Sequence, residues 1–122
     1  MIGFATIGTN DMPRAIAFHD ALFAVIGAKR MADNDRFKSW GTVPGTPMVA
    51  LVIPYDLQPA VAGNGNMIAL KLESRAQVEA MHAKALALGG VDEGAVGLRG
   101  ETFYAGYFRD LDGNKFCAFN RG

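Results

Sequence analysis

The sequence predicts an α+β fold built from two similar βαβββ modules, whose curved sheets together form a cleft. One observation behind this prediction is a repeated order of segments: an apolar strand followed by a helix begins at Ile2 and again at Met67. Another is the capping signal that precedes each helix, at Asp11 and at Ser74. We therefore expect a single domain, 1–122, with a first module at 1–56, a linker at 57–65 and a second module at 66–122.

The first module is expected to contain one helix and four strands. The helix starts after Asn10 or Asp11, with Pro13 in its first turn, where the missing N–H donor does little harm. Apolar residues recur at helical spacing as far as Gly27, which is a natural stop. The expected strands are Ile2–Gly8, Lys29–Ala32, Arg36–Gly41 and Met48–Ile53.

The second module repeats this order with one ambiguous segment. Ser74 and Gln77 form a capping box for its helix, and Gly89 with Gly90 ends the helix. The run Val91–Arg99 is rich in glycine, so the sequence does not decide its secondary structure. The expected strands are Met67–Leu72, Thr102–Arg109 and Asn114–Asn120.

The last two strands form a hairpin whose register can be predicted. A three-residue loop centred on Asp112, with glycine in the left-handed position, places Tyr107 opposite Cys117. Directly opposed residues share a face of the sheet. Tyr107, Cys117 and Phe119 are therefore expected to point the same way.

The composition indicates a globular chain with no net charge. Half of the 122 residues are hydrophobic and the formal net charge is zero, so no basic block indicates nucleic acid or a lipid surface. A chain near neutrality has little electrostatic protection against association, which favours a homodimer.

Cys117 is the only cysteine, no signal-peptide pattern opens the chain, and no apolar run reaches the length of about 20 residues that a membrane span needs. We expect a soluble cytoplasmic protein that binds neither nucleic acid nor membrane.

Three segments are similar to motifs of one known superfamily. The run Asp11–Leu22 resembles the first helix of the vicinal-oxygen-chelate (VOC) superfamily, and Gly63–Leu70 resembles the G-x-G-x-H-I-A-F run that opens the second module in glyoxalase-like members. Arg109–Lys115 is similar to the closing hairpin R-D-P-D-G-N-K, with Leu111 in the place of proline. This superfamily includes glyoxalase I, bleomycin-resistance proteins, fosfomycin-resistance proteins and extradiol dioxygenases, and the chain looks most like small bacterial proteins related to lactoylglutathione lyase. The resemblance implies the glyoxalase/bleomycin resistance/dihydroxybiphenyl dioxygenase fold and a homodimer.

The resemblance also implies where a metal would bind, and those positions lack ligands. Metal-dependent members carry ligands on the first and last strands of each module, at positions that fall on Phe4, Ala50, Met67 and Cys117. Only Cys117 is an ordinary ligand type, whereas a catalytic divalent site needs about three protein ligands. Both histidines fall on predicted helices. We therefore expect no metal and no other cofactor.

Several residues allow two interpretations. Cys117 is either a reactive thiol or a small apolar residue in the cleft floor, and Tyr107 either donates to a ligand or packs in the core. Lys71 and Arg109 either meet an anionic ligand at the cleft rim or are strand-end charges in water. His19 is expected to be a hydrogen-bonded packing residue.

The expected cleft lining is apolar with a few hydroxyl groups, which is the usual profile of a small-molecule pocket. It consists of Phe4, Thr6, Trp40, Met48, Ala50, Met67, Ala69, Tyr107, Cys117 and Phe119. The leading hypothesis is a metal-free VOC protein that binds a small apolar or aromatic molecule in the cleft between its modules.

Two alternatives to this hypothesis stay open. One is a glyoxalase-like lyase or isomerase with an atypical metal or none, for which Tyr107 and Cys117 are the first catalytic candidates. The other is a non-catalytic interaction module whose cleft is filled by its own side chains.

Overall fold

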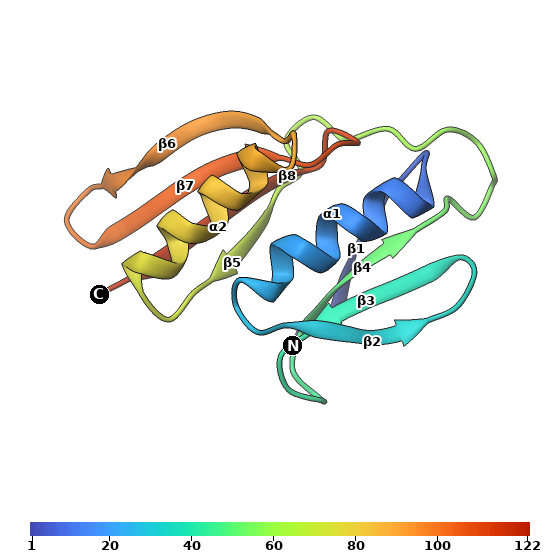
Figure 1. Ribbon diagram of the computed structural model, residues 1–122, viewed down its shortest axis with the longest axis horizontal. Helices are drawn as coiled ribbons and strands as arrows, with labels where there is room; N and C mark the ends of the chain where they lie inside the picture. The colour runs from blue at the N-terminus through green and yellow to red at the C-terminus, as the bar shows by residue number, and fades with distance from the viewer.

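The computed structural model describes residues 1–122 and contains the two expected βαβββ modules in chain order (Figure 1). The first module comprises β1 (Phe4–Gly8), α1 (Met12–Ala24), β2 (Lys29–Asp33), β3 (Phe37–Gly41) and β4 (Met48–Val52). The second comprises β5 (Ile68–Lys71), α2 (Arg75–Ala87), β6 (Val91–Arg99), β7 (Phe103–Arg109) and β8 (Lys115–Arg121). The predicted α+β fold class is therefore confirmed. No helix of the chain is both long and apolar enough to span a bilayer.

The two modules form separate four-stranded sheets with the same strand order. The order is β1-β4-β3-β2 in the first sheet and β5-β8-β7-β6 in the second. In each sheet the first strand of the module runs parallel to the last one, so that Thr6 lies beside Ala50 and Ala69 lies beside Cys117. The repeat that is visible in the sequence is therefore a repeat of sheet topology and of register.

The predicted helix starts are confirmed by their capping bonds. The Asp11 carboxylate accepts from the Arg14 backbone N–H at 3.1 Å, and the Ser74 hydroxyl accepts from the Gln77 N–H at 3.1 Å. Each cap satisfies a donor that the first helical turn leaves free. After α1, Gly27 adopts a positive φ of 72°, a conformation that glycine takes without the steric penalty of a Cβ atom.

The hairpin between β7 and β8 has the predicted register. Tyr107 lies opposite Cys117, and Gly113 takes a positive φ of 86° in the connecting loop. The ambiguous run Val91–Arg99 is a strand, β6, whose pairing with β7 contains two register shifts. These irregularities explain why the alternation of apolar residues along this segment is weak.

A single apolar core spans both modules, because α1 and α2 lie on the same side of the two sheets and contact each other (Figure 1). Its fully or nearly buried members are Ile7, Ala15, Phe18, Leu22, Phe23, Trp40, Val49, Leu51, Leu72, Val78, Met81, Ala85, Phe108, Phe116 and Ala118. Burying one large apolar side chain contributes about 1.5–3 kcal/mol. This shared core holds the two modules in one body.

Candidate functional site

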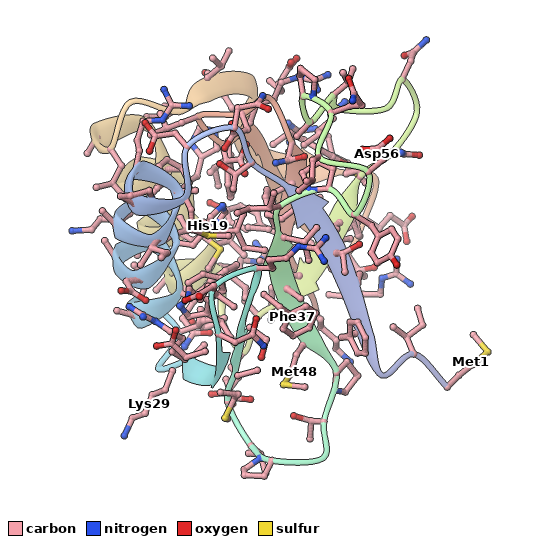
Figure 2. The ribbon with its side chains drawn as sticks, turned by 90° about the vertical axis from the view of Figure 1, so that its right-hand side faces the viewer. Met1, His19, Lys29, Phe37, Met48 and Asp56 are labelled. Atoms are coloured by element: carbon pink, nitrogen blue, oxygen red, sulfur yellow. The ribbon has the colours of Figure 1, made fainter.

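Each sheet has a second face that points away from the helices, which we call the inner face. Side chains alternate between the two faces along a strand. On β4, Val49 and Leu51 enter the helix-side core, so Ala50 and Met48 belong to the inner face. Figure 2 shows His19 between α1 and the sheet, whereas Phe37 and Met48 project on the other side. The inner faces are the surfaces on which the sequence analysis predicts that a ligand binds.

The structure contradicts the expected position of Trp40. Its side chain is 3% exposed and lies in the helix-side core, where its ring is 5.6 Å from that of Phe23. Its Nε1–H donates to the Asp20 carboxylate of α1 at 2.8 Å. In the sequence, the charges of Arg36 and Lys38 on the same strand face favour the cleft side for Trp40. Instead, the Lys38 ammonium reaches the Asp33 carboxylate at 2.8 Å, so this charge is satisfied on the helix side.

The other nine predicted lining residues lie on the inner faces or at the seam between the modules, but one chain does not gather them in one cavity. A cavity of about 410 Å³ at the seam contains Thr6 and Met67, and another of about 370 Å³ contains Ala69 and Trp40. The remaining six line neither of these cavities: Phe4, Met48, Ala50, Tyr107, Cys117 and Phe119. In the single chain, Phe4 remains 52% exposed and Met67 remains 45% exposed.

The four positions implied for a metal do not form a metal site. Nowhere in the chain do three or more His, Cys, Asp or Glu side chains come together in a way that could hold an ion. Both histidines have other partners: His19 lies 2.9 Å from the Asp110 carboxylate, and His82 lies 3.2 Å from that of Asp92. Burial raises the pKa of the Cys117 thiol, which works against the thiolate that a metal prefers. The residues present do not fit a catalytic divalent ion.

Tyr107 and Cys117 form the chemically most distinctive pair on the inner face of the second module. Burial, together with the neighbouring Cys117 thiol, raises the pKa of the Tyr107 hydroxyl. Two cations flank the tyrosine ring: the Arg99 guanidinium lies 5.5 Å from its centroid and the Lys115 ammonium lies 5.8 Å away. The pair is therefore neutral at physiological pH and sits in a positive environment.

The predicted rim cations behave differently from each other. Arg109 forms an ion pair with Glu93 and donates from Nη1 to the Gly113 carbonyl at 2.8 Å, so its charge is compensated within the chain. The hydrogen bond from Arg109 lowers the pKa of Glu93. Lys71 is exposed and forms no ion pair. Arg99 is a cation of the inner face that the sequence analysis did not identify. The only signal for it in the sequence is the pair of glycines, Gly94 and Gly97, that precede it.

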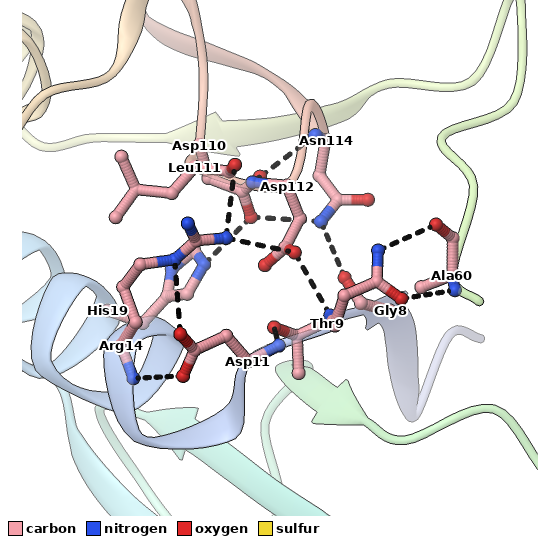
Figure 3. Close-up of polar contacts among 11 residues, drawn as sticks. Gly8, Thr9, Asp11, Arg14, His19, Ala60, Asp110, Leu111, Asp112 and Asn114 are labelled. Carbon is pink, nitrogen blue, oxygen red and sulfur yellow. Dashed lines mark hydrogen bonds and ion pairs between the residues drawn. The ribbon is translucent and has the colours of Figure 1, made fainter. Parts of the chain in front are cut away.

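The hairpin motif around Asp112 connects the modules (Figure 3). The Asp110 carboxylate binds His19 of α1, and Asn114 donates from Nδ2 to the Gly8 carbonyl at 2.9 Å. The Asp112 carboxylate accepts from the Asn10 backbone N–H at 3.0 Å. We call this set of contacts the hairpin latch. The buried histidine expected from the sequence is thus confirmed as a packing residue, and the motif has a structural role.

Several solved structures similar to this chain are named as glyoxalase-related or antibiotic-resistance proteins. A glyoxalase/bleomycin resistance protein from Albidiferax ferrireducens is 33% identical, with a TM-score of 0.90 over 100% of this chain and 99% of that chain. A glyoxalase/bleomycin resistance protein/dioxygenase family enzyme from Burkholderia phytofirmans is 18% identical, with a TM-score of 0.78 over 98% of each chain. The fosfomycin resistance protein FosX from Mesorhizobium loti is 19% identical, with a TM-score of 0.66 over 100% of this chain and 92% of that chain.

Comparisons with models of protein families and with curated proteins find no match. The identity to the Albidiferax protein over the full length is nevertheless sufficient to assign the family. The chain belongs to the glyoxalase/bleomycin resistance protein family of the VOC superfamily.

Proposed function

We propose that this protein binds a small apolar or aromatic molecule on the inner faces of its modules without a metal ion. The observation that carries the proposal is the chemistry of the four equivalent strand positions. Three of them hold Phe4, Ala50 and Met67, and the fourth holds the buried thiol of Cys117. Such a set contacts hydrocarbon surface well and polarises oxygen poorly, which favours binding over metal-assisted chemistry.

Aromatic rings on both inner faces support an aromatic ligand. Phe4 meets Phe37 edge to face with ring centroids 5.6 Å apart, and Phe103 stacks on Phe119 at 5.0 Å. Flat side chains that are already fixed against a neighbour lose little conformational entropy when a ligand packs on them. The thioether of Met48 adds an adaptable contact on the same face as Phe4.

We further propose that a second copy of the chain completes the site. The edge strands β1 and β5 carry exposed inner-face residues at equivalent positions: Phe4 and Thr6 on β1, and Met67 and Ala69 at β5. Their exposure leaves a small ligand incompletely covered by one chain, whereas small-molecule sites bury most of the ligand surface. The zero net charge sets no long-range barrier to association.

Elemental analysis of the purified protein tests the metal-free proposal. We expect Fe, Ni, Zn and Mn each at well below one atom per chain after dialysis, and unchanged ligand affinity with a chelator present. A stoichiometric metal that survives dialysis would contradict it. Binding of a panel of neutral aromatic molecules, followed by thermal shift, tests the ligand class.

Two exposed apolar residues make a matched pair for this binding experiment. Phe4→Ser removes a ring from the inner face, and Leu57→Ser removes an exposed apolar side chain from the linker. Only Phe4→Ser should weaken binding, and equal affinity in both variants would count against the inner face. Analytical ultracentrifugation checks the dimer, for which a monomer at every tested concentration would be the contrary result.

A metal-free reaction is a second candidate, supported by the direct pairing of Tyr107 with Cys117 across β7 and β8. Tyr107 would serve as a neutral acid, since the raised pKa keeps its proton on the oxygen. If turnover of a carbonyl compound is detected, Tyr107→Phe and Cys117→Ser discriminate. Unchanged turnover in both variants would exclude this mechanism.

A further inference from the structure

We propose that the inner face of the second module binds an oxyanion, a carboxylate or phosphoryl group carried by the ligand, between Arg99 and Lys115 beside the Tyr107 ring. This inference rests on the proposed function, because it concerns the same inner-face site, and it names the ligand class more narrowly. The ligand would be an apolar or aromatic body with one anionic group.

The Arg99 guanidinium is held in place by carbonyl oxygens alone. Nη1 donates to the carbonyls of Gly97 at 2.8 Å and Ala105 at 3.2 Å, and Nη2 donates to the carbonyl of Ala95 at 2.6 Å. These bonds use three of the five N–H donors of a guanidinium. Neutral carbonyls fix the group without cancelling its charge, so a directed positive charge with free donors remains at the inner face.

Two glycines of β6 provide the space for this arrangement. A Cβ atom at Gly94 would lie 3.0 Å from the Tyr107 ring and 3.4 Å from Nη2 of Arg99, and one at Gly97 would lie 3.4 Å from Nη1. The register shifts of β6 occur at these same residues. The glycine-rich and irregular strand therefore allows the arginine to fold back over the backbone against the tyrosine ring.

Lys115 supplies a second positive charge, which forms no ion pair although the Glu93 carboxylate lies near enough to feel it. Its ammonium lies over the same ring, and its side chain also lines the seam cavity next to Thr6 and Met67. Neither Arg99 nor Lys115 forms an ion pair, whereas Arg109 on the same sheet is paired with Glu93. The chain thus pairs Arg109 directly with a carboxylate and leaves Arg99 and Lys115 without an ion-pair partner.

The chemistry of the cluster matches an oxyanion. A guanidinium presents planar, paired donors to a carboxylate or phosphoryl group, and an ammonium adds a point charge. The Tyr107 hydroxyl keeps its proton because its pKa is raised, so it can donate to the same oxygen atoms. The adjacent aromatic face of Phe119 lies on the same inner face and can contact the apolar body of the ligand.

The test is a titration of ¹⁵N-labelled protein, followed by NMR, with three probes: benzoate, inorganic phosphate and the neutral benzyl alcohol. Sodium chloride at equal ionic strength is the reference. We expect both anions to shift the Arg99 Nε–H and Tyr107 backbone signals in a saturable way, and benzoate to bind more tightly than benzyl alcohol. Arg99→Gln should weaken benzoate binding about tenfold or more, since it removes a charge-assisted contact.

Arg75→Gln is the matched control, because Arg75 also lies over a tyrosine ring, that of Tyr104, at 4.9 Å. Tyr104 donates to Glu79 of α2, so this pair is on the helix side. Benzoate affinity should be unchanged in this variant. An equal loss in both variants would overturn the oxyanion site, because it would indicate a general charge effect.

The outcomes separate this inference from the proposed function. Absence of saturable shifts at Arg99 with both anions, or equal benzoate affinity in wild type and Arg99→Gln, overturns the oxyanion site. Binding of benzyl alcohol at the inner face would still support the proposed function in that case. Saturable phosphate shifts at Arg99, with no binding of either aromatic probe, would support the oxyanion site and contradict the aromatic ligand.

Discussion

The two modules share one fold and one strand order but differ on their inner faces. The inner face of the first module is apolar, with the Phe4 and Phe37 rings in contact and Ser39 directed at the Met48 sulfur at 3.7 Å. The inner face of the second module places Arg99 and Lys115 over an aromatic ring. The helix sides show no such contrast, because both contribute apolar residues to one core.

This difference indicates that the two sides of each sheet are constrained differently, the helix side by packing and the inner face by its charge and polarity. The helix side must exclude water and fill space, so both modules solve the same packing problem there. The inner face buries small residues such as Ala50 and Cys117, while its larger residues differ in charge and polarity between the modules. A ligand that touches both modules would therefore meet an apolar wall on one side and a cationic wall on the other.

A second contrast lies in the connections between the last two strands of each module. The hairpin of the second module forms the latch to the first, through Asp110, Asp112 and Asn114. In the corresponding hairpin of the first module, Thr46 bonds only to Val43, through its hydroxyl at 2.6 Å and its backbone N–H at 3.2 Å. The hairpin of the second module therefore binds to the first module, whereas the hairpin of the first module makes no such contacts with the second.

The largest expected effect distinguishes the two faces of one strand, β8. Phe116 is fully buried on the helix side and stacks on Phe108 at 5.5 Å, so Phe116→Ala should lower the free energy of unfolding by about 4 kcal/mol. Phe119→Ala, on the partly exposed inner face, should cost about 1 kcal/mol. Urea unfolding measures both, and equal losses would show that the inner face is also part of the stabilising core.

The next largest effect tests the hairpin latch. Asp110→Ala should lower the free energy of unfolding by about 3 kcal/mol, because it leaves His19 buried with no partner at either ring nitrogen. The control is Asp56→Ala, an exposed turn residue that accepts from Gln58, with an expected loss of about 0.5 kcal/mol. A loss below about 1 kcal/mol for Asp110→Ala would mean that the shared apolar core alone joins the modules.

The same carboxylate gives the latch a pH dependence. Burial works to raise the pKa of Asp110, but hydrogen bonds from His19 and Asn114 outweigh it, so the pKa lies below its ordinary value. The stabilisation is therefore complete above the unfolded-state pKa of about 3.9 and is lost as pH falls through the lower folded-state pKa. Urea unfolding below pH 4 should show a smaller fall in stability for Asp110→Asn than for wild type. Parallel curves would exclude Asp110 as the group responsible.

The smallest expected effect is an absence of change, in the fluorescence of Trp40. Trp40 is the only tryptophan and reports on the helix-side core, where it is bonded to Asp20. Benzoate bound on the inner face of the second module should leave its emission unchanged. Quenching that saturates with ligand would instead place the ligand next to Trp40, in the cavity that Trp40 shares with Ala69.

The local features of this protein could be predicted from the sequence. The capping residues Asp11 and Ser74 marked the helix starts, and the loop around Gly113 gave the register of Tyr107 with Cys117. These predictions hold because caps and tight turns depend on a few neighbouring residues whose conformational preferences are strong. The internal repeat also predicted the order of strands and helices, since apolar periodicity reflects burial within each element.

The orientation and partners of the charged side chains were decided by the tertiary structure. Trp40 and Lys38 share a strand face in either interpretation, but only the pairing of β3 with β4 and the docking of α1 put that face inside. Arg109 finds Glu93 on a neighbouring strand, whereas Arg99 finds only carbonyls, and both results depend on the irregular register of β6. Sequence alternation predicts which residues share a face, while contacts between distant segments determine which face is covered and which charges stay free.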